Sequence, residues 1–277
     1  ADFAVQQKVD RVIITDAGQP VATYVFRDDK ILRPYFANVH APGGIQVTRN
    51  HPPVPNVDAT DHDTMHPGVW LAFGDLSGQD FWRNKARIVH ERFVETPAVR
   101  DGQVTFTAES SFQAANGGEI CKQTSRLTLA ARPAGYLLIW EATFRPEQRD
   151  MVFGDQEEMG LGVRVATPIA VKQGGTLRDA LGRRNEREVW GNSADWCDYS
   201  GTIAGRHAGI TTMCDPKNSR PSWHHARDYG ALVVNPFGQQ AFRKGPASKV
   251  VVKPGESFRL CYGLLLYAGP PDAAPDV

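Results

Sequence analysis

Short runs of alternating apolar and polar residues recur along most of the chain. Val104, Phe106 and Ala108 alternate with polar neighbours, and this period of two is typical of a strand with one buried face. Residues 136–144 repeat the pattern, with Tyr, Leu, Trp, Ala and Phe on one side. No long stretch has a convincing helical period. The pattern therefore predicts an all-β protein.

Turn-forming residues separate these runs. They are Asp101-Gly102, Asn116-Gly117-Gly118, Pro133-Ala134-Gly135 and Lys253-Pro254-Gly255. The 26 glycines and 19 prolines are spread along the chain rather than gathered in a linker. This organisation favours one large antiparallel β-sandwich domain over residues 1–277. Two irregular regions, about residues 38–66 and 172–228, are predicted to be long loops, which are often functional in compact β-domains.

The charge and hydropathy of the chain limit the classes of binding partner that can be expected. The sequence has 31 basic and 31 acidic residues, so it lacks the basic excess typical of nucleic-acid or anionic-membrane binding. Its longest apolar runs, such as residues 264–268, are strand-sized and fall far short of the roughly 18 residues of a membrane helix. We expect a small-molecule or oligosaccharide ligand, with no nucleic-acid or membrane partner. The oligomeric state stays open.

The chain begins with Ala1 rather than methionine, which fits a removed signal peptide or a trimmed boundary. We expect a secreted or periplasmic protein. Cys197 and Cys214 flank a glycine-containing stretch and could form a disulfide, whereas Cys121 and Cys261 are expected to be buried in strands. No zinc-type Cys/His spacing, phosphate loop or G-x-S-x-G motif occurs, so no cofactor is expected.

Two groups of titratable residues carry the candidate chemistry. Asp61-His62-Asp63-Thr64-Met65-His66 directly precedes an apolar segment. Such clusters at the mouth of a buried strand are typical of functional sites. Histidine titrates near neutrality and an aspartate neighbour can set its tautomer. Metal binding by His62 and His66 is the weaker hypothesis, because Pro67 argues against the helix that would align them.

The second group is Trp223-His224-His225-Ala226-Arg227-Asp228. If it is extended, His225 and Arg227 share a face with Trp223. An aromatic plane beside an imidazole and a guanidinium suits a sugar, whose C–H face stacks on the ring while its hydroxyls form hydrogen bonds. The alternative is a solvated loop anchored by Trp223. The sequence leaves open whether the two groups meet in space.

Further motifs occur in order along the chain. They are Asp28-Asp29-Lys30, Leu32-Arg33-Pro34-Tyr35, Thr48-Arg49, Gly78-Gln79-Asp80-Phe81-Trp82, Trp196-Cys197-Asp198-Tyr199-Ser200-Gly201, Pro216-Lys217-Asn218 and Asn235-Pro236-Phe237-Gly238. With the two histidine groups, they resemble a bacterial family of unknown function described as methane oxygenase-like (PmoA-type), over about residues 20–267.

The resemblance implies a super-sandwich similar to galactose mutarotase-like proteins and an exported, carbohydrate-related role. The membrane methane oxygenase spans the bilayer with helices, so its activity is not expected for this chain. Many family members read Asp-His-Pro-His-His-Arg-Gly before the tryptophan. Residues 61–68 lack one of these histidines and the arginine, which puts an arginine-dependent step in doubt.

We therefore expect a carbohydrate-active protein, most simply an enzyme of the lyase, hydrolase or epimerase type, with acid–base chemistry in a cleft on a concave sheet face. The expected catalytic residues are His62, His66 and His225. The expected substrate-binding residues are Arg49, Trp223, Arg227, Asp61 and Trp82. Arg33 is more typical of a surface or strand-pairing arginine. The alternatives are a non-catalytic carbohydrate-binding module and a metal-dependent enzyme.

One pair of carboxylates has two interpretations. Glu157-Glu158 precedes the expected strand at residues 161–165. A carboxylate at a strand entry could act as a general base, as the resemblance to mutarotase-like enzymes implies. The simpler interpretation is a charge pair at a hairpin turn.

Overall fold

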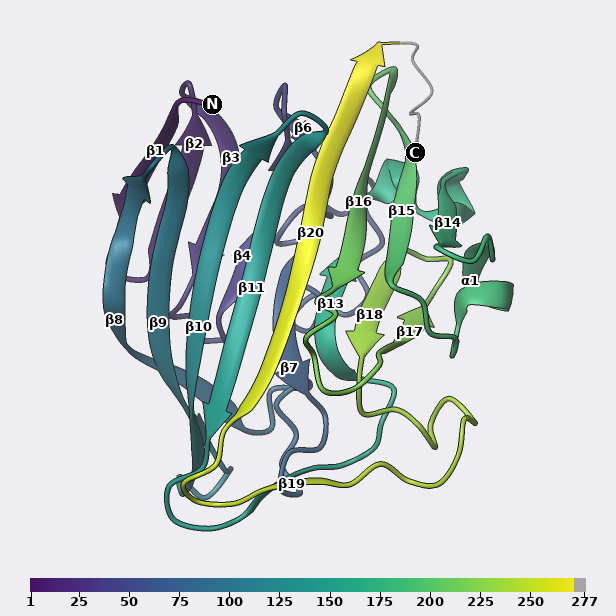
Figure 1. Ribbon diagram of the computed structural model, residues 1–277. Coiled ribbons are helices and arrows are strands. Elements are labelled where there is room, and N and C mark those ends of the chain that lie inside the picture. Colours follow the sequence, from purple (N-terminus) through teal and green to yellow (C-terminus); the bar gives the residue numbers. More distant parts are fainter. Residues whose placement is uncertain (272–277) are drawn as a thin grey trace.

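The computed structural model describes residues 1–271, which form two eight-stranded antiparallel sheets packed face to face (Figure 1). The first sheet has the order β1 (Phe3–Gln7), β2 (Arg11–Asp16), β3 (Gln19–Val25), β4 (Tyr35–Ala37), β7 (Val69–Phe73), β13 (Met159–Arg164), β18 (Ala231–Asn235) and β17 (Trp223–Ala226). The second has the order β14 (Thr176–Asp179), β15 (Trp196–Ile203), β16 (Arg206–Cys214), β20 (Phe258–Pro271), β11 (Gly135–Arg145), β10 (Glu119–Arg132), β9 (Gln103–Gln113) and β8 (Arg87–Arg100). The predicted all-β antiparallel sandwich is confirmed.

Short elements connect the large sheets. Strands β5 (His40–Ala41) and β6 (Ile45–Gln46) pair with each other, as do β12 (Met151–Phe153) and β19 (Val250–Val252). Two 3-10 turns, η1 (Thr167–Ile169) and η2 (Val171–Gln173), follow β13, and the short helix α1 (Asn185–Val189) follows β14. No helix among residues 1–271 has the length and apolarity needed to cross a membrane.

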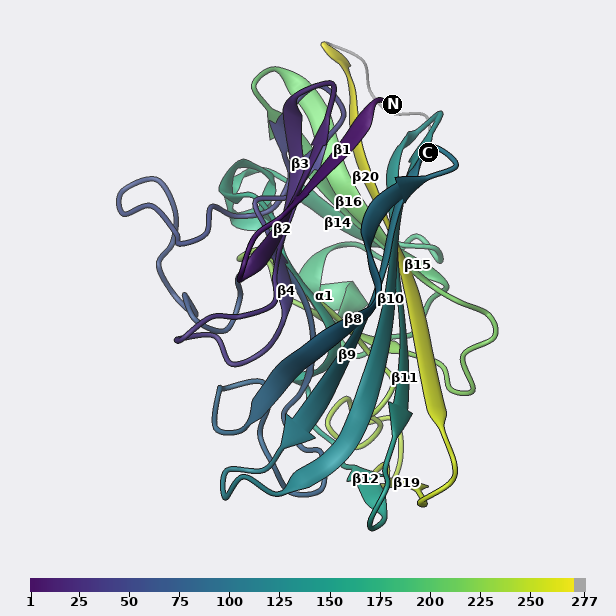
Figure 2. The same cartoon turned by 90° about the vertical axis from the view of Figure 1, so that its left-hand side faces the viewer.

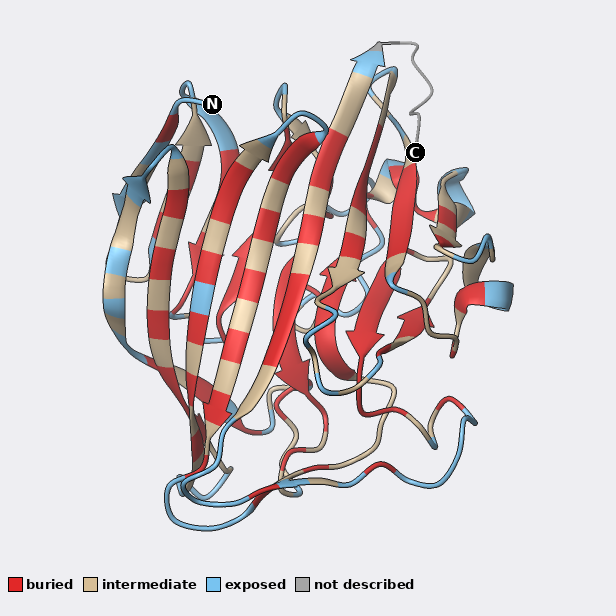
Figure 3. Ribbon diagram, viewed as in Figure 1, coloured by how far each residue is buried: buried red, intermediate tan, exposed pale blue. Residues whose placement is uncertain are grey.

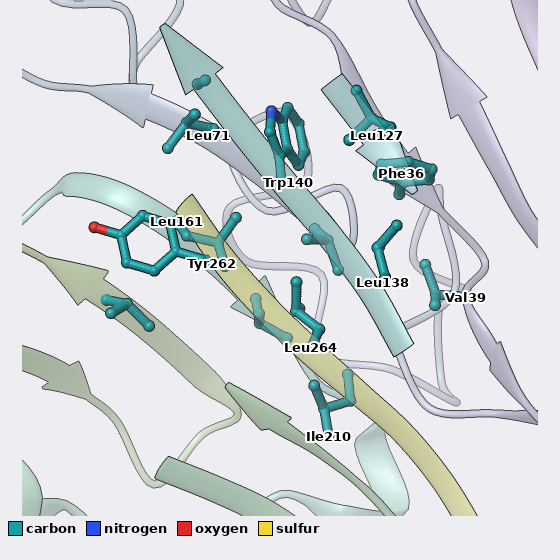
Figure 4. Close-up of a cluster of buried hydrophobic side chains, with 14 of the residues drawn as sticks. Phe36, Val39, Leu71, Leu127, Leu138, Trp140, Leu161, Ile210, Tyr262 and Leu264 are labelled. Carbon is teal, nitrogen blue, oxygen red and sulfur yellow. The ribbon is translucent and has the colours of Figure 1, made fainter. Parts of the chain in front are cut away.

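The second sheet has one face buried against the first sheet and one face that is partly exposed to solvent. Buried and partly exposed residues alternate along β9 and β11, as the bands of Figure 3 show. Val104, Phe106 and Ala108 point inward, as their period of two predicts. Figure 4 shows Leu138, Trp140 and Leu264 of this sheet facing the first sheet. The burial of apolar side chains between the two sheets stabilises the sandwich through the hydrophobic effect.

The central strands of the first sheet are buried on both faces. Strands β7, β13 and β18 contain only buried residues. Leu71 belongs to the core between the sheets, whereas its neighbours Trp70 and Ala72 belong to a second apolar cluster with Trp82 and Val233. Because successive side chains of a strand point to opposite faces, this second cluster lies on the outer face. Figure 2 shows the loops that follow β6 on that outer side.

The structure agrees with one of the two predicted loop regions and contradicts the other. Residues 38–66 are mainly turns, with only the short β5–β6 pair. The prediction of a long loop over residues 172–228 is wrong, because this segment contains β14, α1, β15, β16 and β17. Its inward residues, such as Cys197 and Tyr199, are fully buried on one face of β15, and that tertiary burial overrides the turn-rich composition. All four cysteines are free thiols, so Cys197 and Cys214 form no disulfide.

Candidate functional site

The floor of the site is the outer face of the first sheet. Trp70 of β7 lies across Gly162 of β13, where a Cβ would stand 2.3 Å from the indole. Glycine is therefore required for the indole to lie flat on the neighbouring strand. Trp82 packs edge-on against Trp70 with ring centroids 5.3 Å apart. These two indoles form a rigid apolar base for the loop that carries the first histidine group.

A single turn of the loop brings His62 and His66 together. The carbonyl of His62, whose φ is +51°, accepts hydrogen bonds from the backbone N–H groups of Met65 and His66 at 3.1 and 2.8 Å. The four-residue spacing therefore places both rings on one face without a continuing helix. The imidazoles stack at 4.4 Å, and His66 stacks in turn on Trp70 at 5.1 Å.

Two buried arginines hold this loop from below. Arg49 donates to the backbone carbonyls of Ala59 and Asp61, both at 2.8 Å, and its guanidinium is almost fully buried. Arg33 donates to the carbonyls of Trp82 and Met65 at 2.9 and 2.5 Å. Arg33 was expected to be a surface or strand-pairing arginine; the structure instead buries it, with its guanidinium bound to loop carbonyls. Because Arg49 binds the backbone of this loop, its place in the structure favours loop support over the substrate contact expected from the sequence.

Arg164 of β13 links the carboxylate and both histidines of the loop. It donates to both oxygens of Asp61 at 2.8 Å, and its Nη1 lies 3.0 Å from His66 Nδ1. Asp61 also accepts from His62 Nδ1 at 2.6 Å. The Arg164 hydrogen bonds hold the pKa of Asp61 well below its usual range, helped by His62. Asp61 is therefore an ionised acceptor.

The partners of the two Nδ1 atoms imply opposite tautomers for the two rings. A carboxylate only accepts, so His62 carries its proton on Nδ1 and leaves Nε2 as an acceptor. A guanidinium only donates, so His66 accepts at Nδ1 and carries its proton on Nε2. Burial, followed by the nearby charges of Arg164 and other arginines, lowers the pKa of His66 well below its usual value. His66 is thus a neutral hydrogen-bond donor beside an acceptor.

The second histidine group lies on β17 and its end. His225 Nδ1 is 2.9 Å from Glu157 Oε2, and Arg227 bridges Glu157 and Glu186 at 3.2 and 2.7 Å. The close contact with the His225 imidazole lowers the pKa of Glu157, and the nearby Arg227 guanidinium adds to this effect. Arg83 forms ion pairs with Glu158 and Asp80, both at 3.1 Å. Glu157 and Glu158 therefore belong to the site rather than to a simple hairpin charge pair.

The two histidine groups meet at one cavity of about 80 Å³. Its lining residues are His62, Met65, His66, Trp82, Arg83, Glu158, His225, Tyr229, Ala231 and Val233. Of the residues expected from the sequence, His62, His66, His225 and Trp82 line it directly, while Asp61 supports His62 and Arg227 supports Glu157. Trp223 lies outside this lining, so the structure does not place it where a bound sugar would stack.

Sequence reasoning missed Arg164 and Tyr229. Arg164 sits in a fully buried strand, and a charged residue in such a strand signals a partner or a functional role. Tyr229 stacks on His62 at 6.0 Å, and the Arg164 guanidinium lies 4.8 Å from the Tyr229 ring centre. Larger hollows of about 590 and 570 Å³ are lined in part by the loop that follows β6, but the stacked imidazole pair of His62 and His66 lines the smaller cavity.

The solved structures to which this chain shows some similarity include two carbohydrate enzymes. A GH36 α-galactosidase from Geobacillus stearothermophilus has 13% identity and a TM-score of 0.43, with coverage of 96% of this chain and 41% of that chain. A galactose mutarotase related enzyme from Lactobacillus acidophilus has 10% identity and a TM-score of 0.38, with 99% of both chains covered. This chain thus spans less than half of the α-galactosidase, and these likenesses assign it no activity.

Comparison with curated proteins found no match. A family model matches residues 11–275, nearly the whole chain, and its description gives no activity and no methane oxygenase. The chain belongs to the family of unknown function DUF6807.

Proposed function

We propose that this protein is a carbohydrate-active enzyme that moves protons on a sugar bound at the cavity of His62, His66 and His225. The observation that carries the proposal is the stacked pair of imidazoles, in which His62 Nδ1 contacts the Asp61 carboxylate and His66 Nδ1 contacts the Arg164 guanidinium. One ring offers a lone pair and its stacked neighbour offers a proton, only 4.4 Å apart between centroids. A base and a donor held together suit acid–base chemistry on hydroxyl-bearing substrates.

In the proposed mechanism, His62 Nε2 accepts a proton from the substrate. The ionised Asp61 at 2.6 Å stabilises the imidazolium that forms, as a carboxylate does for the base of a catalytic triad. Arg164 keeps Asp61 ionised and in place through two hydrogen bonds. His66 donates from Nε2 to a substrate oxygen and stays neutral, because burial and the arginines oppose its protonation.

The cavity favours some carbohydrate reactions over others. Most glycoside hydrolases need two carboxyl groups flanking the scissile bond, whereas Glu158 is the one carboxylate among the described lining residues. Proton transfer of the epimerase or lyase type is therefore favoured over hydrolysis. The volume of about 80 Å³ holds only a few water molecules, so one edge of a sugar ring would enter while Trp82 and Tyr229 contact its apolar face.

Metal binding by Asp61, His62 and His66 fits poorly, although their ligand atoms lie within 4.8 Å of one another. Both Asp61 oxygens and the His66 Nδ1 lone pair are already occupied by Arg164. Two further guanidinium groups, Arg33 and Arg49, lower the pKa of His66 electrostatically, and the same positive charge repels a cation at this wall.

Turnover of a panel of mono- and oligosaccharides tests the proposal. We expect His62→Ala and His225→Ala to abolish turnover of the active substrate while far-UV circular dichroism stays unchanged. His207→Ala, on β16 of the other sheet, is the matched control and should keep full activity. Full activity of both cavity variants would refute the proposal. Saturable binding without any chemical change over long incubation would instead identify a carbohydrate-binding module.

A further inference from the structure

The cavity wall opposite His62 and His66 carries excess negative charge. Its ion-pair network contains the carboxylates of Glu157, Glu158, Glu186 and Asp80 and the guanidinium groups of Arg83 and Arg227. Four carboxylates and two guanidinium groups leave a formal charge of −2 within this network. A divalent cation is the simplest group that neutralises such a charge.

His225 supplies an independent sign of a missing ligand. Its side chain is 8% exposed, and its Nδ1 is buried without a hydrogen-bond partner among residues 1–271. The nearest acceptor, Glu157 Oε2, is 2.9 Å away, so the distance is short but the direction is wrong for a hydrogen bond. An unpartnered buried nitrogen is costly, and here it lies close to two carboxylates.

A short contact without hydrogen-bond alignment is compatible with two neighbouring ligands of a metal ion. With bonds of about 2.1 Å at right angles, two ligand atoms stand about 3 Å apart, and the line between them lies roughly 45° off each bond. The His225–Glu157 contact has this short distance and lacks hydrogen-bond alignment. Glu158 completes a set whose ligand atoms all lie within 4.8 Å of one another.

We propose that Glu157, Glu158 and His225 bind one divalent transition-metal ion on the acidic wall of the cavity. One imidazole nitrogen and two carboxylates suit Mn²⁺, Fe²⁺ or Zn²⁺. Three protein ligands leave positions open toward the cavity, which His225 and Glu158 line. If the proposed function holds, these positions take a sugar oxygen opposite His62; ion binding itself does not depend on that function. The proposal replaces the sequence-based expectation of no metal.

The test is calorimetric titration of chelator-treated protein with MnCl₂ and with ZnCl₂ near neutral pH. We expect one ion of at least one of these metals per chain. Glu158→Gln and His225→Ala should weaken binding more than about 100-fold, beyond the 10- to 100-fold loss that follows removal of an outer-shell partner. His62→Ala is the matched control from the opposite wall and should bind within threefold of wild type. Far-UV circular dichroism verifies the fold of each variant.

Each outcome decides the question. The absence of saturable binding of both ions to wild-type protein would overturn the proposal, as would binding that survives both Glu158→Gln and His225→Ala. Loss of binding in His62→Ala but not in His225→Ala would place the ion on the opposite wall, also against the proposal. Because no step of this experiment uses a sugar, its result is separate from that of the turnover assay.

Discussion

Asp61→Asn tests the hydrogen bonds between Arg164 and Asp61, on which the proposed acid–base pair depends. Asp61 accepts two hydrogen bonds from Arg164 at 2.8 Å, and the Arg164 side chain is only 2% exposed. An asparagine amide would present a donor to the guanidinium, so one of the two charge-assisted bonds is lost. Such a bond contributes about 1.5–3 kcal/mol. Because the Asp61 side chain is 39% exposed, water screens the pair and we expect a loss of about 2 kcal/mol.

The assay is urea unfolding at pH 7, followed by tryptophan fluorescence. Asp63→Asn is the control, because Asp63 is exposed and accepts only from the adjacent Thr64 backbone at 2.9 Å. An asparagine oxygen can keep that bond, so the control should change the free energy of unfolding by less than about 0.5 kcal/mol. Equal stability of the two variants would refute the reasoning.

The pH dependence gives a second check on the same variant. The folded pKa of Asp61 lies well below the unfolded value, which is about 3.9. The ionised pair therefore stabilises the protein fully above about pH 4, and this stabilisation is lost as the pH falls toward the folded pKa. The difference between wild type and Asp61→Asn should shrink below pH 4. A difference that grows there would contradict the assignment.

Three further variants test the packing and the buried histidines. Gly162→Val should lower the free energy of unfolding by about 1–3 kcal/mol, because its Cβ would collide with the Trp70 indole at 2.3 Å; urea unfolding beside the exposed-turn variant Gly118→Ala measures this. Trp82→Ala should cost about 3–5 kcal/mol in the same assay, since the side chain is fully packed under the loop. Burial lowers the pKa of His224 to about 4, so wild type should lose up to about 3 kcal/mol between pH 6.5 and 4, where the unfolded chain binds the proton first. His224→Asn should flatten that part of the pH profile, and an unchanged slope would argue against a neutral buried His224.

Much of the sandwich was predictable because its signals are local. Alternation at Val104, Phe106 and Ala108 depends on residues two positions apart, and the structure buries all three. The same logic failed for residues 172–228, where β16 pairs with the distant strand β20 and the hairpin of β15 and β16 thereby joins the large sheet. Glycines and asparagines in that segment indicate turns only when no neighbouring sheet imposes extended pairing.

The candidate site was predictable only in part for the same reason. His62, His66 and His225 stood out as dense titratable groups, and the structure brings them to one cavity. The link through Arg164 joins residues 103 positions apart and depends on how β13 pairs beside β7, so no local pattern could reveal it. Trp223 shows the limit of local patterns in another way. Its segment is extended, as predicted, but its ring does not line the cavity.

The central claim is that a sugar binds where His62, His66 and His225 meet, with the first two rings in opposite tautomers. Long-range ¹H–¹⁵N spectra of ¹⁵N-histidine-labelled protein, titrated with the sugar panel, test it most directly, with signals assigned from single variants. The account predicts a proton on Nδ1 of His62 and on Nε2 of His66, and ligand-dependent shifts of all three cavity histidines while His207 and His224 stay fixed. Reversed tautomers, or a panel in which no sugar shifts the cavity histidines, would contradict it.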